Sequence, residues 1–202
     1  MGPALFDTLV RPVEFFVDSD DPDRYFTHVA EDAPRVRAMF RGGEDPLEKM
    51  RAVWRTAGWR ESVAAEDEQR RYHPDGMWGL RRAAAPPHVD AYEHDREIAL
   101  SRFKRHFNYN VYIQNPDSGG SFIVYNDRGA DDRRRSLDPA QIAELVNNAP
   151  HIEYWPTPGD LVIFDAMYYH EVTQVDGADK ARIQVHSNLL VDPDTREFAL
   201  FD

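Results

Sequence analysis

At 202 residues, of which 42% are hydrophobic, the chain is long enough for one domain with a sizeable core, and it has no apolar run of membrane-spanning length and no secretory signal. Its net charge of −12 argues against nucleic acid as a partner, because binding to the phosphate backbone depends on lysine and arginine. The absence of cysteine excludes disulfides and thiolate ligands, so histidine and carboxylate would have to hold any metal ion, and a cytoplasmic location fits.

The first third of the chain, residues 1–75, has the pattern of a mainly helical segment. Pro22 follows an aspartate-rich stretch that can cap a helix, and Pro34 leaves open whether one helix or two short helices follow. Asp45 and Pro46 have the form of an N-cap and a first-turn proline for the next helix. We expect these helices to pack against the outside of a β core.

From Trp78 onward the pattern changes to strands. Residues 107–114 alternate with period two, which predicts a strand, and we expect its more polar phase to face inward, namely Asn108, Asn110, Tyr112 and Gln114. Dense turn chemistry over 115–120 separates this strand from the next one at 121–125. A helical insertion is expected near 136–149, and insertions between core strands often cover a substrate pocket.

His88 and Asp90 end an extended segment, and residues i and i+2 of a strand project to the same side, so both can bind one ion. His170 follows an apolar run over 161–164 and would approach from a distant strand of a closed or sandwiched β fold. Two imidazoles and one carboxylate can hold a non-haem Fe(II) and leave three coordination positions open. The alternative is a His–Asp pair with local hydrogen bonds and a surface His170, since such a short motif is weak alone.

The order of these features resembles the double-stranded β-helix core of the Fe(II)- and 2-oxoglutarate-dependent oxygenases. The matching features are, in chain order, the ligand pair His88 and Asp90, the polar strand, the glycine turn, His170 and Arg182. The resemblance covers residues 78–192. It implies a mainly β fold with flanking α-helices: a jelly-roll, cupin-like core with N-terminal helices, forming a single oxygenase domain over residues 1–202. It also implies Fe(II) and 2-oxoglutarate as cofactors.

The same resemblance implies that Arg182 binds the distal carboxylate of 2-oxoglutarate, since a guanidinium can grip a carboxylate through two parallel hydrogen bonds. The alternative is an exposed strand arginine beside an aspartate. Asn110 and Tyr112 stand where related enzymes place cosubstrate contacts. Tyr125, on the following strand, is a further candidate for the cosubstrate site.

Four residues are candidates for substrate contacts. Gln184 and His186 share the face of Arg182 by period two, so they would line a cavity, although a buried structural role is an alternative for His186. Arg81 and Arg82 precede the ligand pair on an expected core strand, so one of them should face inward. An inward arginine would suggest an anionic group on the substrate, with structural salt bridging as the alternative.

The resemblance implies oxidation of an unactivated C–H bond of a small molecule, such as an amino acid or a natural-product intermediate, with release of succinate and CO2. Asp90 favours hydroxylation, because family members that transfer halide usually have a small residue here and bind halide in the vacancy. Desaturation and cyclisation stay open, as do two other classes: a cupin-type metal enzyme without 2-oxoglutarate, and a non-catalytic β-barrel binding protein. Substrate identity and oligomeric state cannot be read from the sequence.

Overall fold

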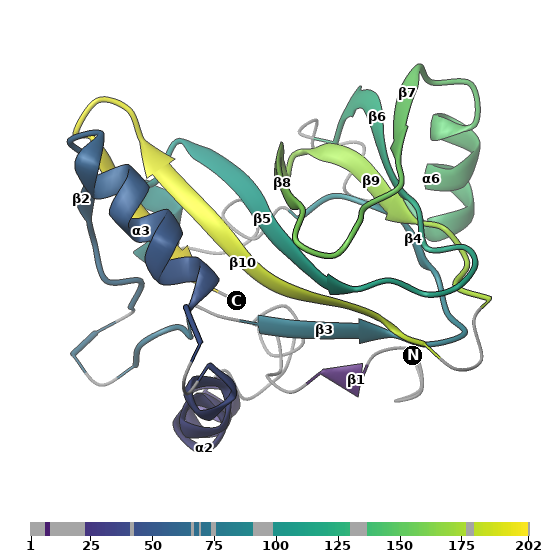
Figure 1. Ribbon diagram of the computed structural model, residues 1–202. Helices are drawn as coiled ribbons and strands as arrows, with labels where there is room; N and C mark the ends of the chain where they lie inside the picture. Colours follow the sequence, from purple (N-terminus) through teal and green to yellow (C-terminus); the bar gives the residue numbers. More distant parts are fainter. Residues whose placement is uncertain are drawn as a thin grey trace.

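The computed structural model describes residues 7–8, 23–40, 43–65, 67–68, 70–73, 76–90, 99–129, 137–176 and 180–201. In these parts of the chain, a seven-stranded sheet and a four-stranded sheet form the core (Figure 1). This is the mainly β architecture with flanking helices that the sequence predicts. Within the described residues, no helix is both long and apolar enough to cross a bilayer.

The long strand β10 (Arg182–Asp192) organises the seven-stranded sheet. It pairs antiparallel with β5 (Arg105–Gln114) along one edge and with β3 (Gly76–Leu80) and β11 (Glu197–Phe201) along the other. The outlying strands are β8 (Leu161–Asp165) beside β5, β1 (Asp7–Thr8) beside β3, and β2 (Arg60–Glu61), which runs parallel to β11.

The four-stranded sheet has the order β4, β9, β6, β7. Its strands are β4 (Ala85–His88), β9 (Tyr168–Val172), β6 (Phe122–Arg128) and β7 (His151–Tyr154). The two sheets meet in an apolar cluster to which both contribute, including Leu80, Phe122, Val172, Val162 and Phe164. Burial of these side chains holds the sheets together and excludes water from the space beside the strand ends.

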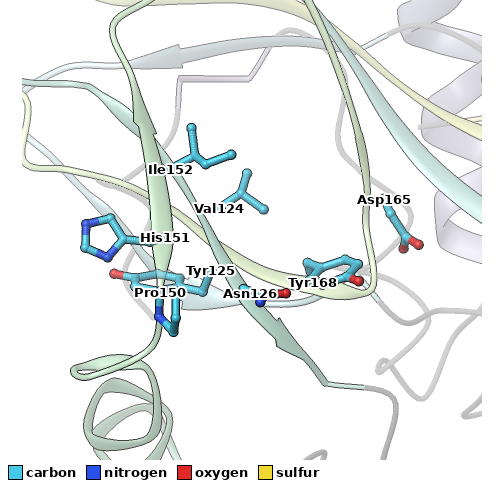
Figure 2. Close-up of a pocket in the computed structure, with 8 residues that line it drawn as sticks. All are labelled: Val124, Tyr125, Asn126, Pro150, His151, Ile152, Asp165 and Tyr168. Atoms are coloured by element: carbon cyan, nitrogen blue, oxygen red, sulfur yellow. The ribbon is translucent and has the colours of Figure 1, made fainter.

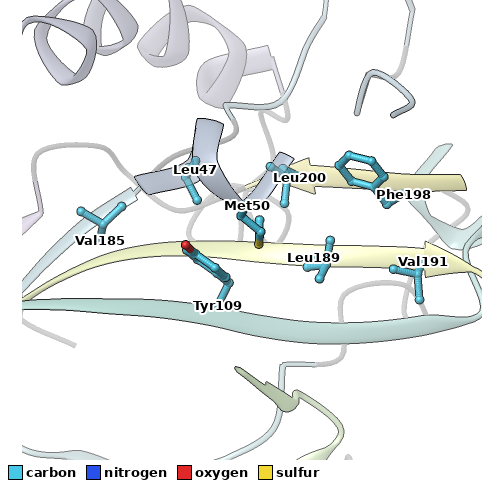
Figure 3. Close-up of a cluster of buried hydrophobic side chains, with 8 residues drawn as sticks. All are labelled: Leu47, Met50, Tyr109, Val185, Leu189, Val191, Phe198 and Leu200. Carbon is cyan, nitrogen blue, oxygen red and sulfur yellow. The ribbon is translucent and has the colours of Figure 1, made fainter. Parts of the chain in front are cut away.

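Helix α3 (Pro46–Thr56) begins where the sequence predicts, since the side chain of Asp45 accepts a hydrogen bond of 2.9 Å from the Leu47 amide. Leu47 and Met50 pack on the outer face of the seven-stranded sheet against side chains such as Tyr109 and Leu189 (Figure 3). The other N-terminal helix, α2 (Asp23–Met39), runs through Pro34 as one element. The first third also contributes β1 and β2, so it is less uniformly helical than its pattern indicates.

The helical insertion is α6 (Pro139–Val146), which Asp138 and Gln141 begin with a capping box, and a short 3-10 helix, η1 (Ala99–Arg102), precedes β5. Val146 of α6 packs against Tyr125 and Tyr169 on the outer face of the four-stranded sheet. Helix α6 therefore lies on the face of that sheet that points away from the space between the two sheets.

Candidate active site

The register of the four-stranded sheet brings the three expected metal ligands together. His88 at the end of β4 pairs directly with His170 of β9, and their ring centroids are 4.3 Å apart. Asp90 follows β4, where its amide donates a hydrogen bond of 3.1 Å to the Ala166 carbonyl. One potential ligand atom from each residue lies within 4.8 Å of the others. His170 is therefore distant only in sequence, because its strand is the immediate partner of β4.

Hydrogen bonds to the backbone orient both imidazoles. The Nδ1 atom of His88 lies 2.7 Å from the Pro86 carbonyl oxygen, and that of His170 lies 2.9 Å from the Tyr168 carbonyl oxygen. A carbonyl can only accept, so Nδ1 carries the proton in each ring and the Nε2 lone pair is left for a metal. Both Nε2 atoms face the Asp90 carboxylate, at 3.7 Å for His88 and 3.4 Å for His170.

Electrostatics favour the charge states that a metal ion requires. Burial by itself would raise the pKa of Asp90, but attraction and hydrogen bonding from His170, with help from His88 and Asn108, lower it below its ordinary value. Although 43% of the His88 side chain is exposed, its partial burial lowers the pKa of His88, and repulsion from His170 adds to this effect. A carboxylate beside the neutral imidazole of His88 is a combination that binds a divalent cation.

Aromatic side chains from both sheets enclose the His170 ring. The Phe164 ring of β8 lies 4.7 Å from it, and the Phe122 ring of β6 lies 6.1 Å away, measured between centroids. His170 is only 4% exposed, so it is not the surface residue of the alternative interpretation.

Arg182 is a buried cation without an anionic partner among the described residues. It is only 3% exposed. Its Nη1 donates a hydrogen bond of 2.6 Å to Gln184 Oε1, and its Nη2 donates one of 2.9 Å to the Tyr112 hydroxyl. Its Nε has no hydrogen-bond partner. Burial lowers the pKa of Arg182, and only the neighbouring Tyr112 opposes this shift. A buried guanidinium held by neutral groups is suited to an anion that enters from outside.

The polar phase of β5 faces the same interior as Arg182, as the sequence predicts. Asn110 pairs directly with His186, and Tyr112 with Gln184, so their side chains lie on one face of the sheet. Asn110 also accepts a hydrogen bond of 2.9 Å from Gln184. The structure thus assembles Asn110, Tyr112, Arg182 and Gln184 into one buried polar network.

His186 lies on the polar face of β10, directly opposite Asn110 of β5. It is 8% exposed, its ring meets the Trp78 ring edge-on at 5.5 Å, and its charge acts on the pKa of His88. No residue spacing in the sequence pointed to Trp78 as a site residue. Its pairing opposite Gln184 on β3 places it on the polar face of β10.

Three other candidates lie away from this arrangement. Tyr125 projects from the outer face of the four-stranded sheet, where its hydroxyl donates to Glu171 at 2.6 Å and its ring packs near α6. Arg81 and Arg82 are both exposed in a bend after β3, and Arg82 has a φ of 54°, so neither belongs to a core strand. Among the described residues, none of these three side chains belongs to the metal-ligand set or to the hydrogen-bond network of Arg182.

Two further residues shape the site. Asn108 on β5 donates a hydrogen bond to Asp90 Oδ2, which its inward phase could have indicated. Gly120 has a φ of 76°, and a Cβ there would lie 3.1 Å from Val175 Cγ2 and 3.4 Å from Arg182 Cδ. A glycine at this turn allows β6 to start close to the arginine.

The residues present fit Fe(II) and 2-oxoglutarate. Two Nε2 lone pairs and one carboxylate on adjoining positions are the donor set of non-haem iron, with no soft ligand that would favour another metal. The unpartnered Nε of buried Arg182 fits the free carboxylate of a bound dicarboxylic acid.

Comparisons with known proteins agree with this geometry. The sequence profile of the family described as carrier-protein-independent halogenase WelO5 matches residues 9–198. No curated protein matches the sequence significantly.

Two crystal structures of an N-substituted L-amino acid dioxygenase from Burkholderia ambifaria AMMD have a similar fold. One, in complex with alpha-KG, has a TM-score of 0.67 at 18% identity over 95% of this chain and 76% of that chain. The other has a TM-score of 0.65 at 16% identity over 89% of this chain and 69% of that chain. The chain belongs to the WelO5 family, within the Fe(II)- and 2-oxoglutarate-dependent oxygenases.

Proposed function

We propose that this oxygenase hydroxylates an unactivated C–H bond of a small molecule and does not transfer halide. The single observation that carries the proposal is Asp90, whose carboxylate faces both imidazoles of the triad. A halide ligand needs a vacant position where this carboxylate stands. With the position filled by an oxygen ligand, oxygen transfer is the reaction that the donor set favours.

The chain's own residues have distinct tasks in this reaction. His88, Asp90 and His170 hold the metal on one face, and the buried Arg182 binds the distal carboxylate of 2-oxoglutarate. Tyr112 and Gln184 hold the guanidinium by hydrogen bonds of 2.9 and 2.6 Å, so little ordering is left to occur on binding.

The bound iron and 2-oxoglutarate supply the oxidising chemistry with O2, and succinate and CO2 are the coproducts. The protein contributes orientation and a site from which water is excluded, since aromatic rings enclose His170. The amino-acid substrate named for the similar Burkholderia dioxygenase supports a free or substituted amino acid as one candidate.

The test is an anaerobic optical titration of the apoprotein with Fe(II) and 2-oxoglutarate, with and without chloride. We expect a visible charge-transfer band at about 500 nm, which is a property of this cofactor pair. In the wild type this band should not depend on chloride. Asp90→Gly should bind 2-oxoglutarate in a chloride-dependent manner, because the vacancy accepts the ion. A chloride-dependent band in the wild type would overturn the proposal, and absence of a band would favour a metal enzyme without 2-oxoglutarate.

A further inference from the structure

A pocket of about 440 Å³ is lined by residues of β6, β7 and the start of β9 (Figure 2). It lies between strands β6 and β7 and the turn that joins β8 to β9. Its lining residues are Val124, Tyr125, Asn126, Pro150, His151, Ile152, Asp165 and Tyr168. The volume is within the range of about 300–1,000 Å³ that is typical of small-molecule sites.

Strand register connects this pocket directly to the metal ligands. His88 pairs with His170, His170 with Val124, and Val124 with Ile152, so a single row crosses all four strands of the sheet. Directly paired residues project to one face, so Val124 and Ile152 continue the face that carries the imidazoles. With strands about 4.8 Å apart, Ile152 lies roughly 10 Å from His170 across the sheet.

The apolar side chains at this edge are unusually exposed for the inner face of a β sandwich. Ile152 is 75% exposed, and the adjoining Tyr154 and Trp155 are 39% and 60% exposed. Tyr154 pairs with Phe122, so it shares the inner face with Ile152. Exposed apolar side chains gathered beside a reactive centre indicate a ligand that covers them.

The pocket and the arginine site lie in opposite directions from His170 along β9. Tyr168 precedes His170 and lines the pocket, while the chain after Val172 leads to Val175, which lies against Gly120 beside Arg182. A molecule in this pocket and an anion at Arg182 would therefore lie on different sides of His170 along β9.

The charges around the pocket do not favour an anion. Asp165 is a lining residue, and Arg128 is already engaged: its Nη2 lies 3.4 Å from Asp165 Oδ2, and its guanidinium lies 5.4 Å from the Tyr168 ring centroid. An anionic group in the pocket would be repelled by the Asp165 carboxylate, and Arg128 is already paired with that carboxylate.

We propose that this pocket is the substrate site, and that the part of the substrate that enters it is an uncharged apolar group lying against Val124 and Ile152. The inference rests on the proposed function, since it assigns a position and a chemical class to the substrate of that reaction. Asn126 at the rim provides a polar group that can orient the rest of the molecule.

The test uses the full chain loaded with Mn(II), or with Zn(II) as the diamagnetic control, in the presence of 2-oxoglutarate. The probes share one ring system: uncharged 2-naphthalenemethanol and anionic 2-naphthoate. We expect the alcohol to bind about tenfold more tightly than the anion, because an unpaired charge beside Asp165 is unfavourable. Mn(II) should broaden the NMR lines of the bound alcohol far more than Zn(II), because the pocket adjoins the metal ligands.

Matched variants locate the binding. Ile152→Asp should weaken binding of the alcohol by about tenfold or more, and Ile152→Ala should weaken it less. Ile113→Asp is the control, because Ile113 is 47% exposed on the outward phase of β5, and it should leave binding unchanged.

The inference is overturned if neither probe binds, if naphthoate binds as tightly as the alcohol, if Mn(II) causes no extra broadening, or if the two aspartate variants behave alike. Failure of the proposed function would be recognised separately. In that case the alcohol would still bind at Ile152, while the wild type would lack the 2-oxoglutarate band or show one that depends on chloride.

Discussion

The side-chain amide of Asn108 donates a hydrogen bond to Oδ2 of Asp90, and this bond joins the seven-stranded sheet to the metal-ligand set of the other sheet. Both residues are buried, at 2% and 9% exposure. Asn108 thereby holds one carboxylate oxygen and leaves the other, Oδ1, facing His88 Nε2 at 3.7 Å. Asn108 would therefore help to orient the Asp90 carboxylate as a metal ligand.

Asn108→Ala should lower Fe(II) affinity by about 10- to 100-fold, which is the usual effect of removing a group that orients a metal ligand. The measurement is an anaerobic metal titration. Asn188→Ala is the matched control, because Asn188 pairs directly with Asn108 in the sheet but bonds His106 instead of Asp90. Equal losses in the two variants would contradict the positioning role of Asn108.

Arg182→Met should abolish 2-oxoglutarate binding without destabilising the apoprotein. The guanidinium is buried without a carboxylate partner among the described residues, so an apolar side chain of similar length removes a desolvation cost. Calorimetric titration measures binding, and urea unfolding measures stability. In the wild type, 2-oxoglutarate at 100 times its Kd should raise the free energy of unfolding by about 2.7 kcal/mol. The same concentration should not change the free energy of unfolding of the variant. Retained binding in the variant would contradict the assignment.

Tyr112→Phe should weaken 2-oxoglutarate binding by roughly fivefold, because it removes the hydroxyl that accepts a 2.9 Å hydrogen bond from Arg182, a bond worth about 1 kcal/mol. Tyr125→Phe should leave this affinity unchanged, since Tyr125 bonds Glu171 on the outer face of the other sheet. Titration with 2-oxoglutarate distinguishes the two. An equal effect of both substitutions would count against the inward network.

Gly119→Ala should destabilise the fold more than Gly159→Ala, although both glycines have positive φ, at 71° and 96°. The conformational cost of about 1–2 kcal/mol is common to both positions. At Gly119, a Cβ would also lie 1.9 Å from the Gln174 carbonyl oxygen, whereas at Gly159 nothing lies within 4 Å. Urea unfolding measures the difference, and equal losses would show that the turn at Gly119 relaxes without cost.

Local patterns were enough to predict several elements. The capping residues Asp45 and Asp138 mark the starts of α3 and α6, because an N-cap acts only on the next turn of the chain. The alternation along β5 gave the inward phase of Asn110 and Tyr112, because side chains of a strand alternate without reference to its neighbours.

Sequence patterns were less informative where the outcome depended on the surroundings of a strand. Tyr125 is on a strand, as expected, but strand position alone does not determine which face meets the interior. Arg81 and Arg82 follow the end of β3, where the chain bends before β4, and nothing in their own residue types marks that end. The pocket wall at Val124 and Ile152 was not predicted, since neither residue carries reactive chemistry.

The sequence by itself determined which residue types were available for the chemistry. It also determined that His88 and Asp90 lie together, because residues i and i+2 of an extended chain project to the same side. Only the tertiary structure decided that His170 stands opposite His88 and that Asn108 reaches Asp90 from the other sheet. These contacts depend on strand register and on how the sheets pack. A shift of one residue would turn every side chain of a strand to the opposite face, so the whole β assembly must select the register.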